Sequence, residues 1–232
     1  MNALAVEGDH EAGLAFAELV FDGKYGGDEA AVKTKKEAKD IARKSAFEFV
    51  KAASDAEHLD GMIRWASVKF HGVREPGPHG SQLAGALYGE SEELYKRLFE
   101  HPSCPSNRQA EFLIGQAQSI DFKSRYKGLD RQAEVFELLQ KALKVDGNSK
   151  LADFILAGIH WDKGEYEKAV IHAKSCCDAY PFAALILQKA SRNGLGVDKD
   201  ESQAQSYYAF WLEKTDPKNR RKKSGILKNL VG

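Results

Sequence analysis

The histidines and cysteines are the residues of this sequence best suited to chemistry. The seven histidines stand at positions 10, 58, 71, 79, 101, 160 and 172. None of them forms an H-E-x-x-H motif, and no histidine–cysteine cluster has the spacing of a zinc site. His160 and His172 are expected on two neighbouring helices, where they could face each other. We interpret them as packing or surface histidines rather than as metal ligands, and we predict no metal and no cofactor.

Other catalytic motifs are missing from the sequence as well. It contains no G-x-S-x-G, Walker or dinucleotide-binding motif, and Gly194-Leu195-Gly196 lacks the further residues of a phosphate-binding loop. Acidic residues are abundant, but no pair stands out as a general acid and base. We therefore predict that the protein is not an enzyme. An enzyme remains an alternative hypothesis, and it would require a deep pocket with convergent ionisable groups.

The composition favours a fold built from helices. Hydrophobic residues make up 43% of the 232 residues and charged residues 29%, as in ordinary folded proteins. Long tracts are rich in Ala, Leu, Glu, Lys and Gln, which favour helices, and no stretch alternates apolar and polar residues as a strand would. We therefore predict an all-α fold.

A sequence element recurs five times along the chain. Each copy has a small residue at position i or i+5 and, in most copies, glycine at i+11; the copies occupy residues 11–23, 60–72, 109–121, 152–164 and 182–194. Small residues let two helices approach closely, and glycine suits a helix end in the left-handed conformation. The third copy departs from the pattern, because Asp121 replaces the glycine. We interpret the copies as the first helices of five hairpins.

A second helix is predicted after each copy. After the last one, Asp200 stands three residues before Gln203 as a helix cap would, and the positions that follow have helical spacing: Ala204, Tyr207, Tyr208 and Trp211. Residues 45–54, 131–143 and 166–176 share that spacing, and residues 91–99 follow it most loosely. We predict antiparallel helix pairs over residues 1–215, irregular over 73–150, in which stacked neighbours cover each other's apolar faces.

The last pair resembles a known family. Its turn and second helix are similar to the Sel-one-like repeat, which has a G-x-G-V turn, an Asp and an aromatic pair: Gly194, Gly196, Val197, Asp200, Gln203, Ala204, Tyr207 and Tyr208. Residues 163–181 look like a unit of the related tetratricopeptide family. The resemblance implies an α-solenoid, a right-handed superhelix that holds other proteins on its concave face and is not a catalyst.

Two segments do not fit the repeat. Residues 71–91 contain two prolines and several glycines, so no regular helix is expected over 74–80. Loops of this length are often functional, and Arg74, His79 and Tyr88 could contact a partner there. An insertion without a task is the alternative.

The second such segment is a basic tail, residues 216–232. Its basic run (Arg220, Arg221, Lys222 and Lys223) precedes four residues that share one helical face: Ile226, Leu227, Leu230 and Val231. We favour a short helix that caps the last hairpin. The alternatives are docking on a partner, or contact of the basic run with nucleic acid or anionic lipid. A net charge of zero argues against a nucleic-acid-binding protein.

The sequence also gives expectations about the cellular compartment and about the distribution of charge along the chain. No signal peptide or membrane span is expected, and Cys104, Cys176 and Cys177 do not form a disulfide framework, so we predict a cytoplasmic protein with reduced thiols. Residues 1–31 hold seven acidic side chains and one lysine, whereas residues 214–232 hold seven basic side chains and one aspartate. Opposite charges at the two ends could steer a partner or favour head-to-tail contacts, or could be solvated without a role.

These features together predict a non-catalytic protein-binding scaffold or adaptor that holds a partner in the groove of the solenoid. The alternative is an immunity- or antitoxin-type protein that neutralises a bacterial toxin or secreted effector. A neutralising protein should bind one partner very tightly, and an adaptor should bind several more weakly. The predicted contacts are exposed polar positions on the first helices and the insert: Arg64, Lys69, Arg74, His79, Gln116, His160 and Arg192.

Overall fold

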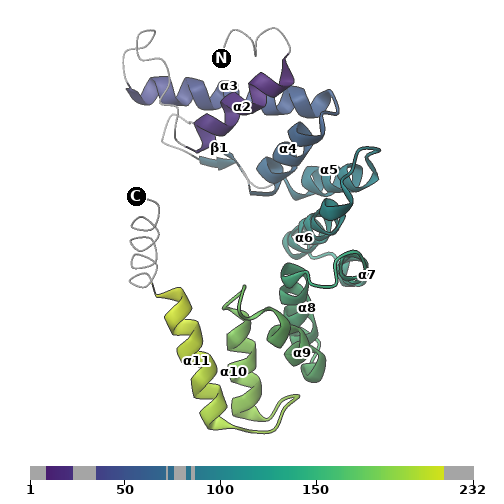
Figure 1. The fold of residues 1–232 in the computed structure, drawn as a ribbon, viewed down its shortest axis with the longest axis vertical. Coiled ribbons are helices and arrows are strands. Elements are labelled where there is room, and N and C mark those ends of the chain that lie inside the picture. Colours follow the sequence, from purple (N-terminus) through teal and green to yellow (C-terminus); the bar gives the residue numbers. More distant parts are fainter. Residues whose placement is uncertain (1–8, 23–34, 72, 76–81, 85–86, 217–232) are drawn as a thin grey trace. The chain divides into compact units, whose positions relative to one another are not determined.

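A computed structural model describes residues 9–22, 35–71, 73–75, 82–84 and 87–216 of the chain (Figure 1). Within these ranges it contains ten α-helices, one 3-10 helix and two short strands. In chain order they are α2 (His10–Phe21), α3 (Lys35–Asp55), α4 (Leu59–His71), β1 (Val73–Glu75), β2 (Gln82–Ala84), α5 (Tyr88–Glu100), η2 (Ser106–Arg108), α6 (Gln109–Lys127), α7 (Gln132–Val145), α8 (Lys150–Asp162), α9 (Tyr166–Cys176), α10 (Ala183–Asn193) and α11 (Glu201–Thr215).

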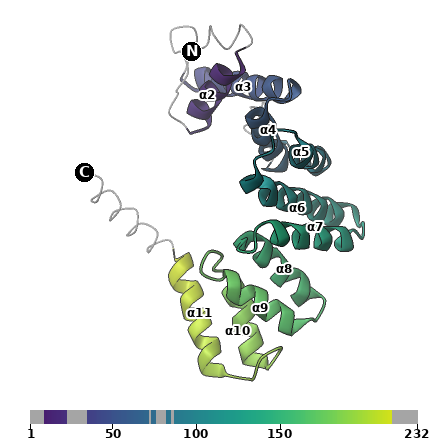
Figure 2. The same ribbon diagram turned by 45° about the vertical axis from the view of Figure 1, so that its right-hand side comes forward.

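The all-α fold class is confirmed. Helices α2, α4, α6, α8 and α10 coincide with the five predicted first helices, and α3, α5, α7, α9 and α11 coincide with the second helices. Consecutive helices pack on each other in pairs: α2 with α3, α4 with α5, α8 with α9, and α10 with α11 (Figures 1 and 2). The right-handed course of the superhelix stays a prediction.

The chain divides into two compact units, and the boundary falls inside α7. Unit 1 comprises residues 1–138 and unit 2 comprises residues 139–232. In unit 1, Phe16 and Val50 belong to one apolar cluster, and Leu98 and Phe112 belong to a second. In unit 2 a single cluster joins α8, α9 and α10: Ala157, Val170, Ala173, Cys176, Ala183, Leu187 and Ala190. The predicted single array over residues 1–215 stays a prediction, and its tail lies outside the described residues from position 217 onward.

The glycine pattern marks the helix ends, as predicted. Gly164 and Gly194 follow α8 and α10 with φ of 74° and 71°, the left-handed region that suits glycine. Asp121 can replace glycine in the third copy because α6 continues to Lys127 and ends at Gly128, where φ is 63°. Gly23 and Gly72, the equivalent positions of the first two copies, lie outside the described residues.

Two of the small residues produce the close helix approach that was predicted. A Cβ atom added at Gly61 would lie 2.6 Å from the Cβ of Ala53, so α4 touches α3 at this point. A Cβ added at Gly115 would lie 2.6 Å from the ring of Tyr95, so α6 meets α5 in the same way. At Gly158 the prediction was wrong, because nothing lies within 4 Å of an added Cβ.

The insert departs from the helical fold. No strand was predicted there, yet β1 and β2 pair antiparallel, with Val73 opposite Ala84 and Glu75 opposite Gln82. Of residues 74–80, where no regular helix was expected, the structure describes residues 74 and 75, which belong to β1 and to no helix. The backbone N–H of Leu87 donates to the carbonyl oxygen of Lys69 at 2.9 Å. The insert therefore leaves the end of α4 and returns to that same end before α5 begins.

Candidate protein-binding site

An aromatic cluster lies at the base of the insert in unit 1. The rings of Phe70 on α4, Tyr88 on α5 and Phe122 on α6 form a triangle, with centroids 5.8, 5.6 and 5.3 Å apart. The Tyr88 and Phe122 rings are stacked, and Phe70 meets both edge-on, which are the favoured geometries of aromatic pairs. We call these three residues the aromatic cluster. Phe122 is 40% exposed and the neighbouring Leu87 is 46% exposed.

The course of the insert explains why these rings meet. Phe70 is the last residue but one of α4, and Tyr88 is the first residue of α5. The pairing of β1 with β2 and the bond from Leu87 to Lys69 bring these two helix ends together. Helix α6 packs on α5 and supplies Phe122. An apolar surface that water reaches therefore sits where three helices and the insert converge.

Charged side chains border the aromatic cluster. Lys69 pairs with Glu90 at 2.7 Å and also lies over the ring of Trp65, 4.7 Å from its centroid. Its side chain is only 16% exposed, so its position is fixed by these contacts.

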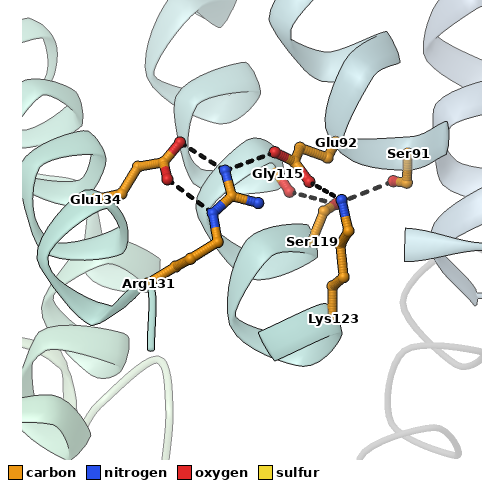
Figure 3. A network of polar contacts seen from close by, with 7 residues as sticks. All are labelled: Ser91, Glu92, Gly115, Ser119, Lys123, Arg131 and Glu134. Carbon is orange, nitrogen blue, oxygen red and sulfur yellow. Dashed lines mark hydrogen bonds and ion pairs between the residues drawn. The ribbon is translucent and has the colours of Figure 1, made fainter. Parts of the chain in front are cut away.

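A second set of charged side chains joins α5, α6 and the beginning of α7 (Figure 3). Glu92 on α5 accepts from Lys123 on α6 at 2.9 Å and from Arg131 at 2.8 Å. Arg131 also donates two hydrogen bonds to the carboxylate of Glu134 on α7, at 2.7 and 2.8 Å. Burial of Glu92 opposes its ionisation, but the hydrogen bonds from Arg131 and Lys123 outweigh it and lower the pKa of this carboxyl. The network therefore ties α5, α6 and the beginning of α7 together as charged partners.

Two buried serine hydroxyls extend these polar contacts from α6 and α5 to α4. The Ser91 hydroxyl donates to the carbonyl oxygen of Ala66 at 3.2 Å. Ser119 lies 3.0 Å from the Ser91 oxygen and 2.8 Å from the carbonyl oxygen of Gly115, and it can donate its one proton to either (Figure 3). Both serines are fully buried. The helices that carry the aromatic cluster are thus held by polar as well as apolar contacts.

A separate polar group lies inside unit 2, around the two histidines that could face each other. The rings of His160 on α8 and His172 on α9 are stacked, 5.3 Å apart and within 6° of parallel. His172 Nδ1 lies 2.8 Å from Asp153, which also accepts from Ser175 at 2.5 Å. His160 Nδ1 lies 2.7 Å from Glu165.

The contacts of this histidine group join α8 to α9. Ser175 donates to Asp153 and not to a histidine, so the group is not arranged as a nucleophile and its base. Burial lowers the pKa of His160, although its hydrogen bond to Glu165 favours the proton. In the described part of the chain, no three His, Cys, Asp or Glu side chains converge as a metal ion would require. The interpretation of His160 and His172 as packing residues agrees with this geometry.

The seven predicted contact residues fall into different environments. Arg64 is paired with Glu18 of α2, Lys69 borders the aromatic cluster, and Gln116 is half-buried. Arg192 is 49% exposed and pairs with Glu201 at 3.3 Å. These four keep some exposed surface.

Of the other three predicted contact residues, one is buried, one lies on a strand and one lies outside the described residues. His160 was predicted as an exposed position, and this was wrong, because the residue is only 3% exposed and packs on His172. Arg74 lies on β1 opposite Leu83. His79 lies outside the described residues.

Only Tyr88 of the aromatic cluster was recognised in the sequence, as a possible contact of the insert. Phe70, Phe122 and Leu87 were missed, since each is an apolar residue that any amphipathic helix would bury. A usable signal existed in the neighbours of the insert. Aromatic residues directly before and after an insertion that interrupts helical spacing are placed at its base.

No family model matches this chain, and no curated protein matches it significantly. Among solved structures, it is similar to the crystal structure of a protective antigen present in uropathogenic Escherichia coli strains, which displays an SLR fold, the fold of Sel-one-like repeats. The TM-score is 0.62 at 16% sequence identity, and the match covers 98% of this chain. The chain has the Sel-one-like repeat fold. The predicted resemblance is thereby confirmed at the level of the fold.

The chain spans less than half of the antigen's length, because the match covers 43% of the antigen's chain. Among the described helices of this Sel-one-like repeat fold, none combines the length and the apolar character that a membrane crossing requires.

Proposed function

We propose that this protein is a non-catalytic scaffold that binds a partner protein, with the aromatic cluster and Leu87 as the centre of the contact. One observation supports the proposal most. Phe122 is 40% exposed although it packs in the aromatic cluster, and Leu87, next to Tyr88 in the sequence, is 46% exposed. Exposed aromatic side chains on a rigid support carry much of the binding energy in protein interfaces.

The rigidity of the support favours this site over the other exposed apolar residues. Phe122 stands on α6, which the Glu92 network and the two buried serines hold against α5. A side chain that is already fixed loses little entropy when a partner binds. Ile171 on α9 is more exposed, at 67%, but it is not among the residues described as packed against the unit 2 cluster.

An affinity capture with the intact chain tests the proposal. We expect a protein that is retained by the wild type and lost with the double variant Leu87→Ser/Phe122→Ser. Ile171→Ser is the matched control, since it also removes an exposed apolar side chain, and it should retain the protein. Equal retention by both variants, or recovery of nucleic acid or lipid alone, contradicts the proposal.

The captured partners also separate the two roles within this class. An adaptor retains several proteins with moderate affinity, whereas a neutralising protein retains one with very high affinity and blocks its activity. We favour the adaptor, in the cytoplasm, where the three free cysteines stay reduced. Titration calorimetry with each captured protein decides between the two.

A further inference from the structure

The last described hairpin carries an exposed apolar face. In earlier hairpins the equivalent face is covered by the helix that follows. On α11, Tyr208 and Leu212 are each 45% exposed, and Phe182 at the start of α10 is 57% exposed. The half-buried ring of Trp211 lies between them, 6.2 Å from Phe182 and stacked on Tyr208 at 5.6 Å. We call Phe182, Tyr208, Trp211 and Leu212 the C-terminal face.

The earlier second helices show what covers the equivalent positions. By repeat register, Tyr208 and Trp211 correspond to Val50 and Ala53 of α3 and to Ala173 and Cys176 of α9. All four of those residues are completely buried. The two pairs of positions are therefore interior wherever another hairpin follows, and exposed at the end of the described chain.

In both earlier cases the cover is the next first helix. Gly61 of α4 packs directly on Ala53. Ala183 and Leu187 of α10 belong to the same apolar cluster as Ala173 and Cys176. The helix that would cover the C-terminal face should therefore follow α11 directly in the chain.

The remaining sequence has the length and pattern for such a helix. Between a second helix and the next first helix, this chain uses three residues (56–58), eight (101–108), four (146–149) or six (177–182). After a connection of eight residues (216–223), the segment that begins at Ser224 contains the four apolar residues on one helical face: Ile226, Leu227, Leu230 and Val231. With this spacing, the basic run would fall in the connection and the four apolar residues would fall in the helix.

We propose that residues 224–232 dock as a short amphipathic helix on the C-terminal face and cover it. The occupant is this chain's own tail and not a second copy, because the tether begins at the end of α11 and keeps the local concentration of the tail in the millimolar range. The indole Nε1 of Trp211, buried without a partner among the described residues, lies at this face. This inference does not depend on the proposed partner site in unit 1.

Hydrogen exchange of the α11 amides in the full chain tests the proposal. Leu227→Asp/Leu230→Asp should speed exchange at residues 208–215 by about tenfold, because local opening increases when the covering contacts are lost. Lys228→Asp is the matched control, since it changes the net charge by the same amount on the segment's other face, and it should leave exchange unchanged. Exchange of the α8 amides reports that each variant is still folded.

Protein concentration separates the tail from a second copy. Protection of α11 in the wild type should be the same at about 1 and about 50 µM, as an intramolecular contact requires. Loss of protection on dilution overturns the proposal in favour of self-association. Equal exchange in the double Asp variant and the wild type, or an equal increase with Lys228→Asp, overturns it as well.

Discussion

Replacing Gly196 by alanine should destabilise unit 2 far more than the same change at Gly194, two residues earlier. The two glycines have the same φ of 71° and lie in one turn between α10 and α11. They differ in their surroundings. A Cβ at Gly196 would lie 2.5 Å from the backbone nitrogen of Glu167 and 2.5 Å from the carbonyl carbon of Tyr166. A Cβ at Gly194 would meet Lys199 at 3.5 Å and the carbonyl oxygen of Val197 at 3.8 Å, both ordinary contact distances.

The magnitude has two parts. A left-handed conformation costs an L-residue about 1–2 kcal/mol, and this part applies to both variants. Forcing an extra carbon into packed surroundings adds about 1–3 kcal/mol, and this part applies only to Gly196, where backbone atoms of α9 stand in the way. We therefore expect a loss of about 2–5 kcal/mol for Gly196→Ala and about 1–2 kcal/mol for Gly194→Ala.

Thermal unfolding followed by tryptophan fluorescence measures the difference. Trp161 and Trp211 lie in unit 2 and Trp65 lies in unit 1, so a Trp65→Phe background reports on unit 2 alone. One kcal/mol shifts the Tm of a unit of this size by about 4–8 °C. Equal Tm values for the two alanine variants would refute the contact between the G-x-G turn and the beginning of α9.

Three further predictions concern the polar and aromatic groups. Tyr207→Ala should cost about 3 kcal/mol in a urea melt, at the lower end for a large aromatic residue, because Tyr207 is half-buried against the unit 2 cluster. No loss would exclude Tyr207 from the core. The folded-state pKa of Glu92 is lowered, so its stabilising contribution is present above the unfolded pKa and is lost as the pH falls through the folded value. Urea melts between about pH 5 and 3 should show a smaller acid-induced loss in Glu92→Gln, and an unchanged loss would contradict the network. The pKa of His160 is lowered by burial, so the unfolded chain binds its proton first and unit 2 should lose stability as the pH falls below about 6.5. His160→Gln should weaken that loss in melts from pH 8 to 5, and the same slope in both proteins would contradict it.

The helical skeleton could be predicted because its signals are local. Gly164 and Gly194 end their helices in the left-handed region, and Asp200 caps α11 by accepting from the N–H of Gln203 at 2.9 Å. Such signals act within one turn of helix and depend little on the rest of the chain. With the helical spacing they located the ten described helices, although α3 begins before the predicted segment 45–54 and α6 continues past residue 121 to Lys127.

The candidate site could not be predicted in the same way. Phe70 and Phe122 are far apart in the sequence and meet only because the insert folds back on itself and α6 packs on α5. His160 was predicted to be exposed, yet its ring lies under His172. Helical spacing gives the side of a helix on which a residue lies, but not which neighbouring helix covers that side.

The sequence by itself determined which segments of the described chain form helices, because helix propensity, caps and glycine turns work over a few residues. Only the tertiary structure decided which side chains stay exposed. Val50 and Tyr208 occupy equivalent positions of the repeat, yet one is completely buried and the other is 45% exposed. The physical reason is that burial depends on what the rest of the chain packs against a side chain. Two side chains at equivalent repeat positions therefore remove different areas of apolar surface from water when their neighbours differ.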